Sequence, residues 1–373
     1  MLTRLCLLAG CHPPKTSTQS PTVENFGKLS DGREAKLYTL GNQKKMTAKV
    51  TDFGATLVAL SAPDREGKTA DLTLGFDTVE GYASEANPCF GATAGRFGNR
   101  IAGGRFTLDD KTYELATNNA PGGIPCHLHG GNVGFNKRMW SVVQATSSSV
   151  TFEYISADGE EGYPGTLTTR VTYTVTEDNE LIWDVTATTD APTVVNIIHH
   201  SYWNLSNQPG SSAKDHILEL HADRYLPTDA GLIPTGEPAP VAGTPMDFTQ
   251  PARVGERITD DFDALKLAGG YDHCWLLNQP DCQGLAPVAR LREPGSGRVM
   301  ELFSNQPAVQ FYAGNFLDEN VSGKNGVRYG PQSGLCLETE NFPDAPNQPA
   351  SPSPILRPGE TYRHRMVHRF SAE

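Results

Sequence analysis

The sequence predicts an all-β protein built as an antiparallel sandwich or barrel, and three observations point to this fold class. Apolar and polar residues alternate with a period of two in many short segments, as in strands with one buried face. Helical periodicity is weak throughout the chain. The 37 glycines and 27 prolines suit many turns between short strands, and 15 phenylalanines and 12 tyrosines argue against disorder.

The clearest elements are two strands at 167–175 and 181–187, which are expected to form a hairpin around Asp178-Asn179. Within both runs the odd-numbered positions are largely apolar and the even-numbered positions largely polar. The remaining expected strands are 48–53, 56–60, 105–108, 150–155, 217–220, 288–291, 299–303 and 309–313. Short helices are expected at 78–83 and 253–258. No internal linker or repeat interrupts the pattern, which predicts one domain over residues 25–373.

Residues 1–24 differ from this domain and predict a lipoprotein-type signal and tether. They begin with Arg4, a short apolar run and Leu8-Ala9-Gly10-Cys11, which resembles a bacterial lipoprotein signal whose cysteine is acylated. A stretch rich in Pro, Ser and Thr follows. We therefore expect membrane attachment through a lipidated Cys11, in the bacterial periplasm or cell envelope. The alternative is a plain N-terminal tail on a cytoplasmic protein.

Charge and cysteine usage narrow the classes of partner. The formal net charge of −12 disfavours nucleic acid as a partner. It suits a neutral or cationic small ligand better than a phosphorylated one. Seven cysteines without a CxxC pair form neither a disulfide framework nor a zinc ribbon. Cys274 and Cys282 could flank a hairpin and form a disulfide; the alternative is that they are buried free thiols.

Polar residues of the kinds that bond sugar hydroxyls gather in glycine- and aromatic-rich sequence. They are Arg96, Arg100, His127, His129, His199, His200, Asp272, Glu338 and Glu340. Each alone has a structural alternative. The two histidines of His127-Leu128-His129 would share one face of a strand and could ligate a metal, but the other ligands would have to come from distant segments. The remaining residues also suit buried strand positions, a solvated strand face or surface ion pairs.

Taken in order, the segments around these residues resemble the aldose 1-epimerase (galactose mutarotase) family. The resemblance runs from about residue 37 to residue 362. Its main segments are Gly95-Arg96-Phe97-Gly98-Asn99-Arg100-Ile101, His127-Leu128-His129-Gly130-Gly131, His199-His200-Ser201-Tyr202-Trp203-Asn204, Gly270-Tyr271-Asp272-His273, Gln310-Phe311-Tyr312 and Leu337-Glu338-Thr339-Glu340-Asn341. It implies a large antiparallel β-sandwich of the galactose mutarotase-like type. The implied activity is that of an isomerase that interconverts the α and β anomers of free aldohexoses such as D-glucose and D-galactose.

The resemblance also implies residue roles. His200, before Ser-Tyr-Trp, matches the general acid, and Glu338, between Leu and Thr, matches the general base. The substrate-binding residues that it implies are Arg96, Asn99, His129, Asp272 and Gln310. Neither a metal nor an organic cofactor is expected, the partner is a small sugar, and the protein is expected to be a monomer or a homodimer. The chain departs from the family pattern in a longer link at 120–126, in Gly98 where Ala is common, and in Glu340 where Gln is common.

These residue types suit the chemistry, because opening a hemiacetal ring moves one proton off the anomeric hydroxyl and another onto the ring oxygen. A carboxylate and an imidazolium can do both. If 337–341 is extended, Glu338 and Glu340 project to the same face, and a second carboxylate would raise the proton affinity of the first. The competing interpretations are a hexose-phosphate epimerase, a non-catalytic sugar-binding protein, and a glycosidase, which would need two carboxylates at the scissile bond.

Overall fold

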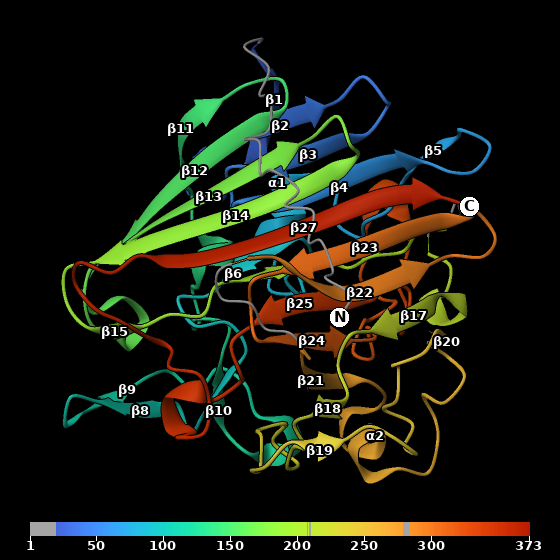
Figure 1. Cartoon of the computed structure of the whole chain (residues 1–373). Coiled ribbons are helices and arrows are strands. Elements are labelled where there is room, and N and C mark those ends of the chain that lie inside the picture. Colours follow the sequence, from blue (N-terminus) through green and yellow to red (C-terminus); the bar gives the residue numbers. More distant parts are fainter. Residues whose placement is uncertain (1–19, 207, 209, 279–283) are drawn as a thin grey trace, which may run out of the picture.

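The computed structural model describes residues 20–206, 208, 210–278 and 284–373. Its largest feature is a nine-stranded antiparallel sheet that crosses the molecule (Figure 1). In order of pairing, its strands are β11 (Ser141–Ala145), β12 (Ser149–Ser156), β13 (Leu167–Val175), β14 (Glu180–Thr189), β27 (Tyr362–Ala372), β23 (Arg298–Ser304), β22 (Ala286–Arg292), β17 (Ile217–Leu220) and β20 (Ala252–Arg253).

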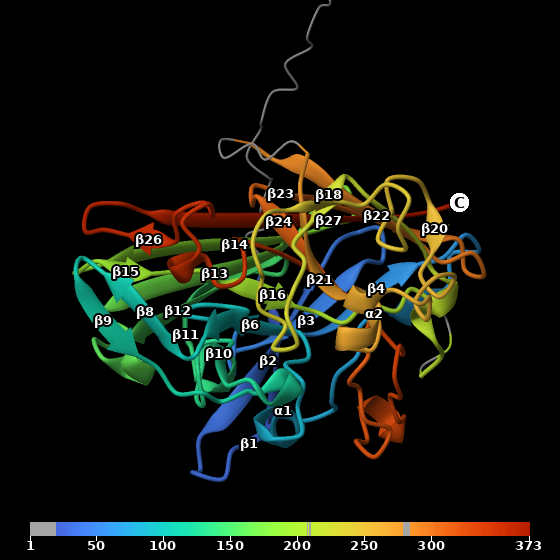
Figure 2. The same cartoon turned by 90° about the horizontal axis from the view of Figure 1, so that it is seen from below.

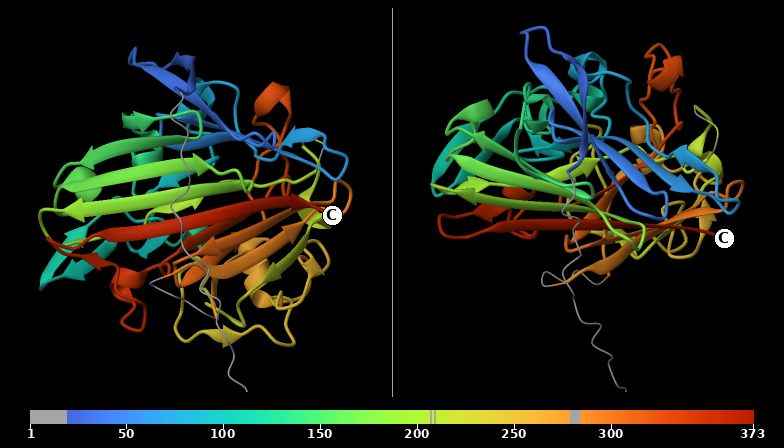
Figure 3. Two further views of the ribbon diagram at one scale, coloured as in Figure 1. Left: turned by 45° about the horizontal axis from the view of Figure 1, so that its top comes forward. Right: turned by 90° about the horizontal axis from the view of Figure 1, so that it is seen from above.

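A five-stranded antiparallel sheet from the N-terminal part of the chain packs against the nine-stranded sheet. Its strands are β1 (Thr22–Lys28), β2 (Glu34–Gly41), β3 (Thr47–Thr51), β4 (Thr56–Pro63) and β5 (Thr69–Asp71). Figure 3 shows these blue strands lying against the green and red strands of the larger sheet. Between the sheets lies the main hydrophobic core, where the ring of Tyr38 in β2 meets that of Phe152 in β12 at 5.7 Å. Strand β1 begins ahead of the domain boundary expected at residue 25.

A second five-stranded sheet lies toward the lower right of Figure 1 and positions the functional site. In order of pairing, its strands are β19 (Ala239–Pro240), β18 (Arg224–Tyr225), β21 (Asp272–Leu276), β24 (Ala308–Tyr312) and β25 (Cys336–Glu340). Four short antiparallel pairs complete the strands: β6 (Ala92–Ala94) with β16 (Ile198–His200), β7 (Arg100–Ala102) with β10 (Cys126–Leu128), β8 (Arg105–Leu108) with β9 (Lys111–Glu114), and β15 (Thr193–Val194) with β26 (Ile355–Leu356). In Figure 2 the first three of these pairs lie on one side of the nine-stranded sheet.

Helices are short throughout the described part of the chain. The two α-helices are α1 (Val79–Ala83) and α2 (Asp263–Ala268). The single turns of 3-10 helix are η1 (Pro121–Gly123), η2 (Phe135–Lys137), η3 (Glu160–Gly162), η4 (Ala213–Asp215), η5 (Lys324–Gly326) and η6 (Ala345–Asn347). No helix among the described residues is long and apolar enough to cross a membrane.

The structure confirms the all-β fold class and most of the expected strands. Strands β13 and β14 form the predicted hairpin, and in β14 the odd positions Leu181, Trp183, Val185 and Ala187 are buried while their neighbours are not. The helix expected at 78–83 is α1.

The helix expected at 253–258 is wrong. Arg253 belongs to strand β20, and the next two residues donate their backbone N–H groups to distant carbonyls instead of to the preceding turn. Val254 bonds the carbonyl of His216, and Gly255 bonds that of Lys214. Pairing with the segment around β17 therefore overrides the weak helical pattern, which the glycine already disfavours.

The described residues include only part of what was predicted for the cysteines. Cys274 is a buried free thiol in β21, as one of the two alternatives held, whereas Cys282 lies outside the described residues. Cys11 and its lipoprotein-type signal also lie outside the described residues.

Candidate active site

Side chains from three neighbouring strands form one wall of a cavity of about 430 Å³. Gln310 in β24 lies directly opposite Glu338 in β25, and Asp272 lies at the start of β21, on the other side of β24. Six of the seven site residues that the resemblance implies line this cavity. They are Asn99, His129, His200, Asp272, Gln310 and Glu338. The fold thus brings together residues that lie far apart in the sequence, from the second sheet, from β16 and from the loops around β7 and β10. Asn99 and Glu338, for example, are 239 positions apart.

Strand alternation sends the two adjacent histidines of β16 to opposite sides. His200 points into the cavity, where its ring stacks on Tyr202 at 5.1 Å. His199 points into the hydrophobic core and stacks on Trp183 at 5.2 Å, with His368 at 5.7 Å. Only His200 can therefore contact a ligand in the cavity.

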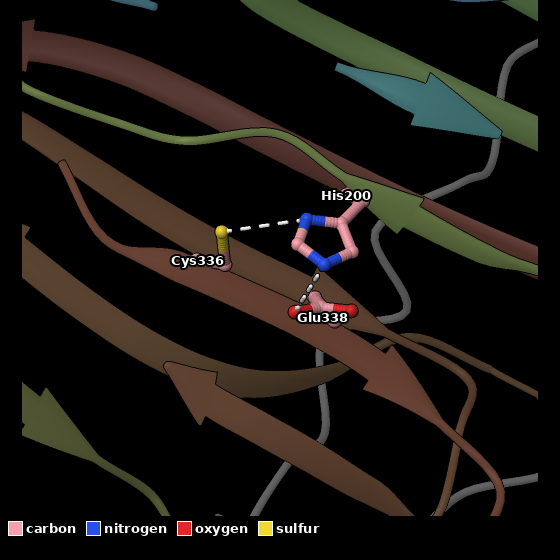
Figure 4. Close-up of side chains that lie close together, drawn as sticks. All are labelled: His200, Cys336 and Glu338. Carbon is pink, nitrogen blue, oxygen red and sulfur yellow. Dashed lines mark hydrogen bonds and ion pairs between the residues drawn. The ribbon is translucent and has the colours of Figure 1, made fainter. Parts of the chain in front are cut away.

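His200 and Glu338 face each other across the cavity wall. The imidazole Nε2 lies 3.5 Å from a carboxylate oxygen of Glu338 (Figure 4). On the other edge of the ring, Nδ1 lies 3.6 Å from the thiol of Cys336, two residues before Glu338 on the same face of β25. Burial raises the pKa of this thiol well above its ordinary value, so the thiol stays protonated. Nε2 is the ring nitrogen that faces Glu338, so it is the one placed to exchange a proton with that carboxylate.

Burial favours the uncharged form of both groups. It lowers the pKa of His200 to about 4. Burial also raises the pKa of Glu338 well above its ordinary value; the carboxyls of Glu340 and Asp272 add to this rise, and Arg100 opposes it. Two groups in contact titrate as a unit with two apparent pKa values. Between those values the pair holds a single proton, so one member can act as an acid while the other acts as a base.

Further polar groups in the cavity are free to bond a ligand. Gln310 donates its amide to Asp272 at 2.7 Å, while its own carbonyl oxygen has no partner among the described residues. Nor does the Nε of Arg100 have one within the described part of the chain. His129 accepts the backbone N–H of Asn99 on Nδ1, so the neutral ring carries its proton on Nε2. Donors and acceptors of this kind match the hydroxyls of a sugar.

Arg96 does not belong to this cavity, which corrects the role that the resemblance implies for it. Its guanidinium is buried elsewhere and donates to the backbone carbonyls of Ser156, Pro164 and Gly165 at 2.7–3.0 Å. Those bonds hold the segments on either side of η3 in place. They also occupy both terminal nitrogens of Arg96, which therefore cannot bind a sugar. Arg100, four residues later, lines the cavity instead.

His127 and His129 do not form a shared metal site. His127 lies in β10 and contacts the carbonyl of Ala116 and the hydroxyl of Tyr163, each at 2.7 Å. His129 follows the strand with a φ of 52° and turns into the cavity. The pattern of two histidines on one strand face therefore does not extend to His129.

His200, Cys336 and Glu338 form the one set within the described ranges that could approach a metal ion together, with ligand atoms within 4.8 Å of one another. However, the thiol faces Nδ1 and the carboxylate faces Nε2 (Figure 4). Zinc requires bonds of about 2.0–2.3 Å, which all three ligands cannot make to one ion from opposite edges of the ring. This arrangement fits a resident metal poorly.

Sequence reasoning named Arg100 among the candidates but gave the binding role to Arg96, and it missed Cys336 as the partner of His200. A signal existed for the thiol, because side chains two positions apart share one face of a strand, which places Cys336 beside Glu338. No signal in the sequence distinguishes the two arginines, because Arg96 and Arg100 lie in the same glycine-rich motif. Only the folded loop determines which of their side chains points into the cavity.

Comparison with known proteins agrees with this geometry. The family model described as Aldose 1-epimerase matches residues 36–369. The chain is 44% identical over 353 residues to the galactose mutarotase of Homo sapiens, with 94% of this chain and 99% of that protein covered. It is 37% identical over 345 residues to the aldose 1-epimerase of Escherichia coli (strain K12), covering 92% and 97%.

Solved structures give the same result. The GalM/aldose epimerase homologue from C. elegans is 32% identical and superposes with a TM-score of 0.82, covering 91% of this chain and 99% of that one. The galactose 1-epimerase from Lactobacillus acidophilus NCFM is 27% identical, with a TM-score of 0.80 and coverages of 95% and 99%. This chain therefore belongs to the aldose 1-epimerase family, the mutarotases, and is an isomerase.

Proposed function

We propose that the protein interconverts the α and β anomers of free aldohexoses, D-glucose and D-galactose among them, with His200 as the general acid and Glu338 as the general base. The observation that carries this proposal is the 3.5 Å approach of the imidazole to the carboxylate in a cavity lined by sugar-bonding groups. An acid and a base of this kind each contribute roughly 10²–10⁴-fold to the rate of a proton-transfer reaction.

The reaction needs only this pair. In ring opening, Glu338 takes the proton of the anomeric hydroxyl while Nε2 of His200 gives its proton to the ring oxygen. The bond between C1 and the ring oxygen breaks, and a carbonyl forms at C1. After rotation about C1–C2, the former ring oxygen attacks the other face of the carbonyl, returns its proton to His200, and the carbonyl oxygen takes the proton from Glu338. The site ends as it began.

The non-reacting hydroxyls must be held so that C1 alone rotates. In this proposal Asn99, Arg100, His129, Asp272 and Gln310 hold them, because all five line the cavity. Arg100 replaces Arg96 in this role.

The two arginines offer a matched test of this replacement. Arg100→Ala is expected to raise KM for galactose by roughly 10- to 100-fold, the effect of losing a hydrogen bond from a charged donor. Arg96→Ala is expected to lower the melting temperature, because it leaves buried carbonyls without donors, and to leave KM near the wild-type value at temperatures where the variant is folded. Steady-state kinetics and thermal unfolding of both variants decide the matter. The reverse pattern would return Arg96 to the sugar site.

The activity itself is tested by polarimetry of freshly dissolved α-D-glucose and α-D-galactose with purified protein in excess EDTA. We expect acceleration toward the anomeric equilibrium, unchanged by the chelator. A parallel sample of galactose 6-phosphate distinguishes a hexose-phosphate epimerase. Loss of activity in EDTA with recovery on adding zinc would contradict the cofactor-free reaction, and a preference for the phosphorylated sugar would contradict the substrate class.

We also propose that the segment ahead of strand β1, within the residues 1–24 set apart by the sequence, is a lipoprotein-type signal and tether that attaches the enzyme to a bacterial envelope through Cys11. Support comes from Leu8-Ala9-Gly10-Cys11 and from the family match, which begins only at residue 36. In a bacterial host, the wild type is expected in the membrane fraction after high-salt washing, with a diacylated cysteine by mass spectrometry. Cys11→Ser is expected to release the protein or to block its processing. Wild-type protein that stays in the cytosol with residues 1–10 attached would contradict this location.

A further inference from the structure

We infer that Glu340 is a positioning residue of the reaction, an ionised carboxylate that orients Asn99 and holds a fixed negative charge behind the His200–Glu338 pair. This inference rests on the proposed function. Glu340 lies two residues after Glu338 in β25, so both side chains leave the same face of the strand. Glu338 borders the cavity, whereas Glu340 is fully buried and lies outside its lining.

Both oxygens of Glu340 accept amide hydrogen bonds. The Nδ2 of Asn99 donates to one oxygen at 3.0 Å, and the Nδ2 of Asn196 donates to the other at 3.3 Å. Asn99 lines the cavity and also binds His129 through its backbone N–H. Glu340 thereby fixes the side chain of a cavity residue from behind.

The orientation of each amide is set by backbone groups and not by Glu340. The oxygen of the Asn99 amide accepts the N–H of Arg100 at 2.8 Å. The oxygen of the Asn196 amide accepts the N–H of Asn341 at 3.0 Å, and its nitrogen also donates to the carbonyl of Gly98 at 3.0 Å. Turning either amide over would place an NH₂ group against a backbone N–H. Both asparagines must therefore present donors to residue 340.

Two fixed donors are best matched by two acceptors, and an ionised carboxylate offers a full acceptor at both oxygens, whereas protonation would turn one of them into a hydroxyl that accepts only weakly. Glutamine has one oxygen and one NH₂, so it would set a donor against a donor on one side. Burial raises the pKa of Glu340 well above its ordinary value, and the two amide bonds oppose that rise by stabilising its charged form. Among the described residues, no amide donates to Glu338. Of the two neighbouring carboxyls, Glu340 therefore keeps a fixed charge, and Glu338 is the one that exchanges a proton.

The other groups around the two carboxyls leave this charge incompletely balanced. The titratable groups that couple to the two carboxyls or contact them are Cys89, Arg100, His200, Tyr202, Asp272, Cys274, Tyr312, Cys336 and Tyr362. Burial raises the pKa of each of these thiols and phenols, which therefore stay neutral. Arg100 is the one cation in this set at neutral pH, against the carboxyls of Asp272, Glu338 and Glu340. A fixed charge at Glu340 thus increases the proton affinity of the catalytic pair.

The test is the pH dependence of kcat/KM for Glu340→Gln, with galactose as the substrate. Removing a neighbouring negative charge lowers both apparent pKa values of a coupled pair. Both limbs of the profile are therefore expected to move to lower pH, by about one unit, the size that a nearby like charge produces. KM is expected to rise several-fold, because Asn99 loses a fixed acceptor. A purely structural role would lower stability and rates without moving the limbs.

Two further variants separate charge from packing. Glu340→Asp keeps the charge, so its limbs are expected within a few tenths of a unit of the wild type. Asp344→Asn is the matched control: Asp344 is a buried carboxylate held by the amides of Asn347 and Gln348, and its φ of 59° suits asparagine. Its profile is expected to match the wild type. Should Glu340→Gln fail to fold, ¹³C NMR of labelled glutamate carboxyls in the wild type, assigned with Glu338→Gln, gives the protonation order directly.

The outcomes distinguish this inference from the function on which it rests. Unmoved limbs in Glu340→Gln, or a carboxyl at 340 that holds its proton while Glu338 is ionised, would overturn the role of Glu340 and leave wild-type mutarotation intact. A wild type without mutarotation would overturn the proposed function in the same assay.

Discussion

Glu338→Gln is expected to lower kcat for anomer equilibration by at least about 10³-fold, toward the background rate. Glutamine keeps the size and position of the side chain in β25 but cannot take the proton of the anomeric hydroxyl. The cavity and the 3.5 Å contact with His200 are otherwise expected to be preserved. The measurement is polarimetry at saturating galactose, with substrate binding followed separately by calorimetry.

The control for this variant is Asp344→Asn, which also removes one buried carboxylate from the same part of the chain but does not reach the cavity. We expect this control to keep wild-type kcat, with at most a modest loss of stability. A Glu338→Gln enzyme that binds galactose and retains more than about a tenth of wild-type kcat would show that another group is the base, because removal of a catalytic base costs about 10²-fold or more.

His200→Asn is expected to lower kcat by about 10²–10⁴-fold, the range for loss of a general acid. Its neighbour provides the matched variant. His199→Asn places a polar amide against Trp183 and His368 in the core and is expected to destabilise the fold by about 1–3 kcal/mol, with kcat close to that of the wild type. The measurements are kcat by polarimetry and unfolding by urea, for both variants. Equal losses of kcat would mean that the strand does not separate the two side chains in function.

The sequence allowed the fold class to be predicted because alternation is a local property. In β13 and β14 the buried positions are apolar except for Thr169 and Thr174, and a turn signal lies between the two strands, so the pattern alone determines the faces. The expected helix at 253–258 shows the limit. Its backbone N–H groups bond carbonyls of Lys214 and His216, about 40 residues away, and no local pattern encodes such a partner.

The candidate site divides in the same way. Alternation assigns His200 and His199 to opposite sides and places Cys336 with Glu338 on one face, so these relations follow from local sequence. The choice between Arg96 and Arg100 does not, because it depends on which arginine meets the carbonyls near η3 after folding. Likewise, Glu340 shares a face with Glu338 but lies behind the cavity, because Asn99 and Asn196 occupy the space around it.

The most direct test of the account is the rate of galactose mutarotation by the double variant His200→Asn/Glu338→Gln, compared with both single variants in excess EDTA. An acid and a base that act in one concerted proton transfer fail as a unit, so their losses do not multiply. The account predicts that the rate of the double variant lies within about threefold of the rate of the slower single variant. The two effects are not additive because the two residues are coupled in one proton transfer. Losses that multiply across the two positions, or a single variant with wild-type kcat, would contradict the claim that His200 and Glu338 form one catalytic pair.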